Sequence, residues 1–251
     1  MTDTRLIGWP LVDLSRAPNG PRDRQLLMGE AVIVTGQRNG WAELRARSDG
    51  YPGFVPEAAL GRDAPVTHRV SARATHLYPA PDVKTPERAL LSLGAQLEVL
   101  DETGRFARTR QGFVPRAHLS PLEAPETDPV AVAARLVGTP YLWGGNSALG
   151  IDCSGLVQMA CLACAIPCPG DSAEQQAALG TPLPETAPLA RGDLLFWRGH
   201  VAWVVDPDTL LHANAHHMAV AFEPLEKALA RIEAQGDGPV TARKRLPPRT
   251  V

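Results

Sequence analysis

A cysteine at the start of a predicted helix is the first candidate for chemistry in this sequence. The segment 141–145 (YLWGG) leads through a short loop to Asp152-Cys153-Ser154-Gly155, after which an apolar helical pattern begins. The free amides and the dipole at a helix N-terminus favour a thiolate, and a nearby imidazolium would lower the thiol pKa further, from about 8.5 into the range ~3.5–7.5. The alternative is a small buried side chain. The surrounding residues favour Cys153 as a nucleophile.

Two histidines in a predicted hairpin are candidates for the base. The strand patterns of residues 200–205 and 209–213 are joined by Asp206-Pro207-Asp208. If this turn has three residues, His200 and His212 lie on one face as diagonal neighbours, whereas a two- or four-residue turn would separate them. On the favourable register, one imidazole accepts the thiol proton and the other orients it.

Two polar residues near the cysteine, Asp152 and Tyr141, have two interpretations each. A carboxylate at Asp152 raises the thiol pKa, so it opposes thiolate formation and needs another explanation. It is either the counter-charge for a substrate ammonium group, with Ser154 adding a hydrogen bond, or a helix cap. Tyr141 either places its hydroxyl near a developing oxyanion or belongs to the core.

The other cysteines allow a metal or redox interpretation. Cys161 and Cys164 fall inside the apolar helix, and Cys168 follows it. Because no fourth partner follows at zinc-finger spacing, we expect the three thiols to pack in the core and expect neither a metal nor a cofactor.

Composition excludes several classes of protein. The 251 residues are 44% hydrophobic and 21% charged, which is typical of a globular chain. The formal net charge of −2 disfavours nucleic acid as a partner. No apolar stretch approaches the ~20 residues of a membrane helix, and the first residues lack a basic region followed by an apolar core. We therefore expect a cytoplasmic protein without a membrane span, with reduced thiols.

An internal repeat organises the N-terminal half. Gly53-Phe54-Val55-Pro56 is echoed by Gly112-Phe113-Val114-Pro115, and the similarity extends upstream. The first copy carries about six extra residues near Ser48-Asp49-Gly50-Tyr51. Each copy consists of short alternating strands, which predicts two successive small barrels.

The repeat and a Pro-rich acidic stretch set the expected domain boundaries. They are residues 1–62 for the first barrel, 63–122 for the second, 123–128 for a linker and 129–251 for the last domain.

The last domain is predicted to be α+β. Asp128-Pro129 is typical of a helix start, a second helix is expected from Cys153 to about Ile166, and a third after Pro224. Strand patterns, including residues 194–197, lie between the second and third helices.

The motifs together resemble one enzyme family. The last ~120 residues resemble the NlpC-type (NlpC/p60) cell-wall cysteine peptidases in the motifs Tyr141-x-Trp143-Gly144-Gly145, Asp152-Cys153-Ser154-Gly155, Arg191-Gly192-Asp193-Leu194, His200-Val201 and Leu211-His212-Ala213. The resemblance implies a papain-like fold in which Cys153 is the nucleophile, His200 the base and His212 the residue that orients it, with Tyr141 near the oxyanion. The repeated half looks like two bacterial SH3-like barrels.

Family members with such barrels recycle murein peptides. The resemblance implies a γ-D-glutamyl-L-diamino acid endopeptidase that cuts before diaminopimelate in a peptide with a free N-terminal L-alanine. It also implies that Tyr51 closes the amine pocket beside Asp152 and Ser154, and that Trp143 and Ser172 line the substrate. Gly170 stands where arginine is usual in the family.

Alternative functions remain open at this point. A thioester can pass to water or to an amine, so the same residues allow an amidase or acyltransferase. Paired barrels with an inert partner domain would instead bind wall fragments. In a third alternative, the protein is exported and its barrels target intact cell wall.

Overall fold

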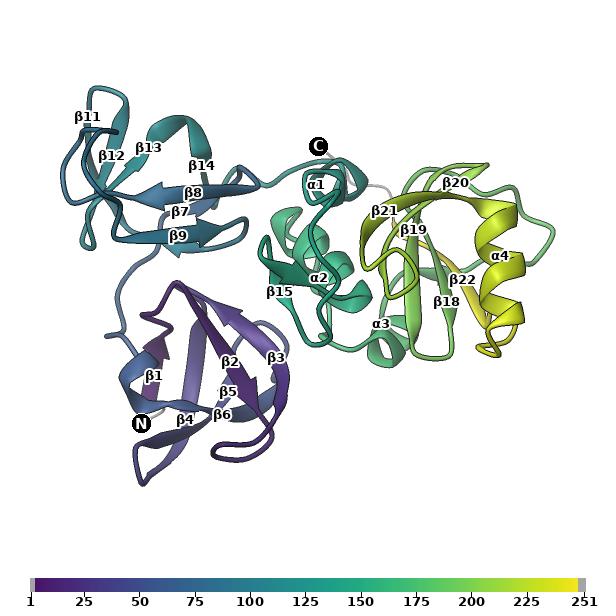
Figure 1. The fold of residues 1–251 in the computed structure, drawn as a ribbon, viewed down its shortest axis with the longest axis horizontal. Helices are drawn as coiled ribbons and strands as arrows, with labels where there is room; N and C mark the ends of the chain where they lie inside the picture. Colours follow the sequence, from purple (N-terminus) through teal and green to yellow (C-terminus); the bar gives the residue numbers. More distant parts are fainter. Residues whose placement is uncertain (1–2, 248–251) are drawn as a thin grey trace. The chain divides into compact units, whose positions relative to one another are not determined.

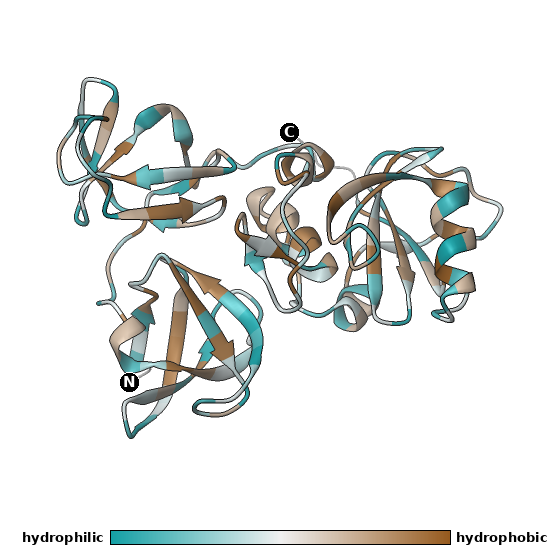
Figure 2. Cartoon of the chain, viewed as in Figure 1, coloured by the Kyte–Doolittle hydropathy of each residue, from teal (hydrophilic) through white to brown (hydrophobic). Residues whose placement is uncertain are grey.

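The computed structural model describes residues 3–247, which divide into two compact units (Figure 1). The first unit holds the residues up to Pro125 together with Asn146–Leu149. The second holds Glu126–Gly145 and the residues from Gly150 onward. Hydrophobic stretches lie on strands of both units and also on helices of the second unit (Figure 2).

The first repeat copy is a single antiparallel sheet. Its strands run in the order β1-β4-β5-β6-β2-β3. Alternate residues such as Leu14, Leu44 and Val55 are fully buried and build one core. The bounds are β1 (Asp3–Leu6), β2 (Leu11–Ser15), β3 (Arg22–Leu27), β4 (Ala31–Arg38), β5 (Trp41–Ala46) and β6 (Pro52–Pro56), followed by the 3₁₀ turn η1 (Glu57–Ala59).

The second repeat copy is divided into three small antiparallel sheets. Their orders are β10-β7-β14, β11-β12-β13 and β8-β9. The bounds are β7 (His68–Val70), β8 (Ala74–Leu77), β9 (Ala89–Ser92), β10 (Gln96–Leu97), β11 (Val99–Thr103), β12 (Phe106–Thr109), β13 (Phe113–Pro115), η2 (Arg116–His118) and β14 (Leu119–Pro121).

The structure explains the extra residues of the first copy. Trp41 pairs with Pro56 in the first copy, as Phe106 pairs with Pro115 in the second. The additional residues therefore lie between β5 and β6, in the segment that contains Tyr51, as the sequence predicts. Both copies are built from short antiparallel strands, as the sequence predicts, and in the part of the chain that the structure describes their strand ladders are open sheets without a closed barrel.

The second unit wraps helices around an antiparallel sheet. The sheet order is β17-β22-β18-β19-β20-β21. Figure 1 shows α2 and α4 on opposite sides of the sheet, which confirms the α+β prediction. The bounds are α1 (Pro129–Ala134), β16 (Gly150–Ile151), α2 (Cys153–Ala163), α3 (Ser172–Ala178), β17 (Thr181–Pro182), β18 (Asp193–Trp197), β19 (His200–Asp206), β20 (Thr209–Asn214), β21 (Ala219–Pro224), α4 (Leu225–Ala234) and β22 (Ala242–Arg245); β15 (Asn146–Ser147) belongs to the first unit.

Capping residues define the helix starts. The Asp128 side chain accepts hydrogen bonds from the amides of Val130 and Ala131, and Pro129 occupies the first turn of α1, as predicted. Helix α2 begins at Cys153, also as predicted, but it ends at Ala163 rather than near residue 166. No helix in residues 3–247 combines the length and the apolar character needed to span a bilayer.

Candidate active site

Cys153 is the first residue of α2 and is almost entirely buried. Its exposed fraction is 7%. The Cys153 thiol donates to the carbonyl oxygen of Gly199, with Sγ 3.9 Å from that oxygen. A hydrogen bond from the Val201 backbone to the sulfur acts to lower the thiol pKa. Because these two residues flank His200, the fold brings the candidate nucleophile to the candidate base.

The hairpin reaches the expected register by an unexpected route. Strands β19 and β20 are joined by a two-residue turn, because Asp206 pairs with Thr209. The condition of a three-residue turn is therefore not met. A β-bulge next to Asp206 adds one residue to β19, so that Trp203 lies opposite Leu211. The bulge restores the register, and the two candidate histidines share one face of the sheet.

A continuous hydrogen-bonded chain runs across three neighbouring strands. His200 Nε2 lies 2.9 Å from His212 Nδ1, and His212 Nε2 lies 2.9 Å from Glu223 Oε2. Arg231 on α4 holds the same carboxylate with two hydrogen bonds, Nε to Oε1 at 2.9 Å and Nη2 to Oε2 at 2.7 Å. The pairing of His212 with Ala221 places Glu223 on the face that carries both histidines.

The charge state of Glu223 determines where the protons lie in this chain. Burial acts to raise the pKa of Glu223, but hydrogen bonds from Arg231 and His212 together hold that pKa well below its usual range. An ionised carboxylate only accepts hydrogen bonds, so His212 Nε2 must donate. Burial lowers the pKa of His212, and the neutral ring then accepts at Nδ1 from His200 Nε2. The network thus assigns the unprotonated nitrogen of His200 to Nδ1.

The resting protonation of the nucleophile and base differs from the sequence expectation. Burial, together with the neighbouring Asp152 carboxylate, raises the pKa of the Cys153 thiol to about 12. Burial and the charges of His212 and Arg231 lower the pKa of His200 to about 3. A thiolate with a lowered pKa was therefore the wrong expectation, because desolvation outweighs the amides of the helix N-terminus. The free protein holds a neutral thiol beside a neutral imidazole.

Asp152 caps helix α2, which confirms one of its two interpretations. Its Oδ1 accepts from the Gly155 amide at 2.7 Å and from Ser154 Oγ at 3.1 Å, and its Oδ2 accepts from the Gly144 amide at 2.8 Å. Burial raises the pKa of Asp152, while these three hydrogen bonds lower it. A carboxylate offers about four lone-pair positions, so one acceptor position is left for a further donor.

Tyr141 lies half-buried within electrostatic reach of the nucleophile. Burial, followed by the charges of Cys153 and Asp152, raises the pKa of Tyr141 to about 12. The phenol therefore stays protonated at neutral pH and can donate to an oxyanion.

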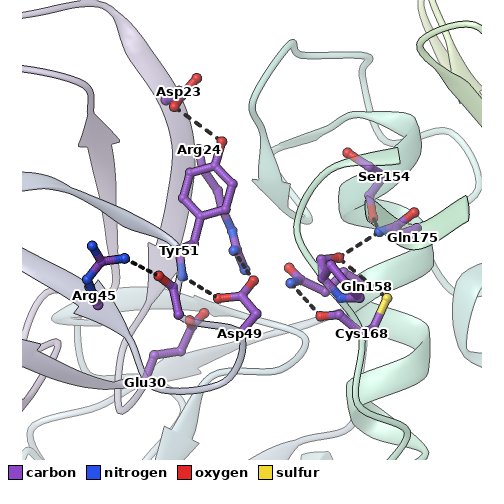
Figure 3. A network of polar contacts seen from close by, with 12 residues as sticks. Asp23, Arg24, Glu30, Arg45, Asp49, Tyr51, Ser154, Gln158, Cys168 and Gln175 are labelled. Atoms are coloured by element: carbon purple, nitrogen blue, oxygen red, sulfur yellow. Dashed lines mark hydrogen bonds and ion pairs between the residues drawn. The ribbon is translucent and has the colours of Figure 1, made fainter. Parts of the chain in front are cut away.

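Trp143 and Ser172, which are also expected to line the substrate, lie in different surroundings. Trp143 is 60% exposed. Ser172 is the first residue of α3, which Gln175 ties to α2 by donating to the Ser154 carbonyl at 2.9 Å (Figure 3). The charge of Asp171, the N-cap residue of α3, acts to raise the pKa of Asp152. The start of α3 therefore lies near the Asp152 carboxylate.

Tyr51 belongs to the first unit, where its own partners hold it. Its hydroxyl donates to Asp23 Oδ2 at 3.2 Å, and its amide donates to Asp49 Oδ1 at 3.1 Å (Figure 3). The Arg24 guanidinium lies 5.1 Å from the ring centroid and pairs with Asp49. Its assignment to an amine pocket stays a prediction.

The remaining three cysteines are buried, as packing residues are, and none is disulfide-bonded among residues 3–247. This holds for Cys161, Cys164 and Cys168.

Among the described residues, the group of potential metal ligands within 4.8 Å of one another is His212, His217 and Glu223. Arg231 already occupies that carboxylate with a positive charge, which opposes a cation there.

Sequence reasoning missed Glu223 and Arg231. The strand β21 was not predicted, so the carboxylate had no place beside His212. The available signal was the composition of Ala219–Pro224, where Val220 and Phe222 are residue types typical of a strand. A buried glutamate in a strand requires a partner for its charge, and Arg231 on α4 is that partner.

Comparisons place these features among known proteins. Residues 138–232 match the NlpC/P60 family, and residues 14–60 match the bacterial dipeptidyl-peptidase Sh3 domain. A gamma-D-glutamyl-L-lysine dipeptidyl-peptidase of Bacillus subtilis (strain 168) is 29% identical over 215 residues, which cover 75% of this chain and 71% of the relative. A protein of the same name from Bacillus cereus (strain ATCC 10987 / NRS 248) is 25% identical over 238 residues, covering 81% and 70%. The solved NlpC/P60 family protein from Bacillus cereus ATCC 10987 has a TM-score of 0.82 at 21% identity and covers 97% of this chain and 100% of its own, a likeness of fold.

Proposed function

Because this chain contains an NlpC/P60 domain preceded by a bacterial SH3 domain, we propose that it hydrolyses the γ-D-glutamyl bond to an L-diamino acid in murein peptides with a free N-terminal L-alanine. The relatives named gamma-D-glutamyl-L-lysine dipeptidyl-peptidase support lysine as one such diamino acid, beside the diaminopimelate expected from the sequence. The observation that carries the proposal is the hydrogen-bonded chain from His200 through His212 to Glu223, next to the buried thiol of Cys153.

The first chemical step starts from the neutral pair. His200 Nδ1 takes the proton from the Cys153 thiol as Sγ attacks the γ-carbonyl carbon of D-glutamate, so the S–C bond forms while the carbonyl oxygen gains the negative charge. The charge that forms on His200 is stabilised through His212 by the ionised Glu223. The Tyr141 hydroxyl donates to the oxyanion.

The proton then leaves with the product. The imidazolium of His200 protonates the leaving amine of the diamino acid, the C–N bond breaks, and a thioester to Cys153 remains. Water attacks the thioester while His200 accepts its proton, and the acid is released with the thiol restored. Because the proton moves only as Sγ attacks, the resting protein does not need to hold a buried thiolate, which desolvation would make unfavourable.

The free acceptor position of Asp152 supports selection of an unblocked amine. Three donors hold its carboxylate in place, so it is oriented before substrate binds. An ammonium group on the L-alanine would complete its hydrogen bonds. Ser154, Trp143 and Ser172 are proposed to line the same peptide.

The proposed role is turnover of released wall peptides in the cytoplasm. An unblocked L-alanine occurs on a free peptide, not on one still joined to the glycan through that residue. Cell fractionation tests the compartment, and recovery outside the cell would support action on intact wall instead.

The decisive experiment is mass spectrometry of L-Ala-γ-D-Glu-L-Lys and its diaminopimelate analogue after incubation with the protein. We expect L-Ala-D-Glu and the free diamino acid, no cleavage by Cys153→Ala, and retained cleavage by Cys164→Ala, which also removes a buried thiol. The N-acetylated peptide should be cut poorly. Cleavage by Cys153→Ala would refute the mechanism, transfer to an added amine in preference to water would indicate an acyltransferase, and binding without cleavage would indicate a binding module.

A further inference from the structure

A cavity of about 310 Å³ opens beside the candidate base in the second unit. Tyr141, Gly199 and His200 line it, so it is continuous with the residues around the thiol. Asn214, Arg198 and Asp237 also line it, and none of these has a part in the chemistry described above. Its volume falls at the small end of the range for ligand sites, which suits a group the size of an amino acid.

Asn214 presents an unsatisfied donor at this cavity. The residue is 5% exposed. Its Oδ1 lies 2.8 Å from the backbone nitrogen of His217, and a backbone N–H can only donate, so the oxygen and nitrogen of the amide are unambiguous. The Nδ2 atom has no hydrogen-bond partner in residues 3–247. A buried N–H without a partner is costly, which indicates that a ligand acceptor completes it.

The charges around the cavity have both signs. Arg231 reaches it, but its guanidinium is bonded to Glu223 and Gln235. Arg198 is exposed and makes no hydrogen bond or ion pair within the described part of the chain, so its charge is available to a ligand. Asp237 is also exposed and supplies a carboxylate. The cavity therefore offers one cation, one anion and one buried amide donor.

We propose that this cavity binds the leaving diamino acid, with its α-carboxylate on Asn214 Nδ2 and Arg198 and its side-chain ammonium toward Asp237. The inference rests on the proposed function. The leaving amine must lie within reach of the imidazole that protonates it, so the leaving residue must occupy space that borders His200. Of the two ends of the substrate, the free L-alanine is assigned to Asp152, which leaves this cavity for the other end.

The test pairs a change in the protein with a change in the substrate. L-Ala-γ-D-Glu-L-Lys and its C-terminal amide, which lacks the carboxylate charge, are cleaved by the wild type and by Arg198→Gln. A charge-assisted contact on an exposed arginine predicts a loss of roughly three- to tenfold in kcat/KM for either single change. The loss from Arg198→Gln should be several-fold smaller on the amide than on the acid. Lys227→Gln, which removes one positive charge from an exposed site on α4, should leave both rates unchanged.

A binding measurement separates this inference from the proposed function. L-Lysine and L-lysinamide are titrated into the Cys153→Ala protein while the Asn214 side-chain amide is followed by nuclear magnetic resonance. Lysine should shift that signal at lower concentration than its amide, and Arg198→Gln should weaken the response. If the peptide is not cut but lysine shifts Asn214, the proposed function fails and the cavity assignment stands. If the peptide is cut while acid and amide behave alike in both assays, the cavity assignment is overturned.

Discussion

Replacing Glu223 by glutamine tests the proton assignment of the whole site. The substitution keeps the size and hydrogen-bonding capacity of the side chain and removes its charge. An amide can donate as well as accept, so His212 Nε2 is no longer required to carry the proton. The alternative tautomer would leave His200 Nδ1 protonated and unable to accept the thiol proton.

The expected loss follows from the bonds at the carboxylate. His212 donates to Glu223 at 2.9 Å, and the imidazolium formed at His200 is one ring further away. A hydrogen bond to a charged group contributes about 1.5–3 kcal/mol, which corresponds to roughly a 10- to 150-fold decrease in kcat if it is felt mainly in the transition state. KM should change little, because Glu223 is buried behind His212 and does not line the cavity.

The assay measures kcat and KM for L-Ala-γ-D-Glu-L-Lys, with circular dichroism to verify folding. Nitrogen-15 shifts of His212 report the tautomer directly, with Nε2 protonated in the wild type and a mixture in Glu223→Gln. Glu226→Gln, which removes an exposed carboxylate from the first turn of α4, is the matched control and should retain full activity. A kcat within twofold of the wild type, or an unchanged His212 tautomer in the variant, would refute the reasoning.

Three further predictions concern the nucleophile, the cap and the first unit. The iodoacetamide reaction of Cys153 should accelerate about tenfold per pH unit from pH 6 to 9 without a plateau, because its pKa is raised to about 12 and the reactive thiolate keeps increasing with pH. Asp152→Asn should raise KM for the free-amine peptide roughly tenfold or more, since it removes a charge-assisted contact while asparagine still caps the helix. Gly29→Ala should destabilise the first unit in urea by about 1–3 kcal/mol more than Gly40→Ala, since both glycines have positive φ but an added Cβ meets the Gln96 carbonyl oxygen at 2.1 Å only at Gly29.

Each of these has a matched comparison. Subtracting the alkylation of Cys153→Ala removes the contribution of the other thiols, and a rate that levels off below pH 7 would mean that a thiolate–imidazolium pair already exists. The N-acetylated peptide lacks the ammonium, so equal KM effects of Asp152→Asn on both peptides would leave only the cap. Equal unfolding midpoints for the two glycine variants would show that the backbone at Gln96 moves away from the added Cβ without lowering the free energy of unfolding.

The sequence predicted the starts of two helices and the strands around His200 and His212 because local signals encode them. Asp128 and Pro129 start α1, and Asp152 starts α2 at Cys153, where cap and dipole effects act within one turn. The repeat located the extra residues before Pro52 because both copies use the same strand pairs. Whether the strand ladders stay open or close on themselves was not predictable in this way, since closure depends on pairing between strands far apart in the sequence.

The candidate site also has features that local sequence signals predict and features that only the packing determines. Residue types and spacing were enough to nominate Cys153, His200 and His212, because a nucleophile at a helix start and two histidines in a hairpin are local patterns. The register that joins the histidines depends on a bulge, which only the tertiary structure decided. The protonation of Cys153 was also decided there, because desolvation depends on everything packed around the sulfur. Glu223 and Arg231 meet across a strand and a helix, so that contact arises from packing and not from any one segment.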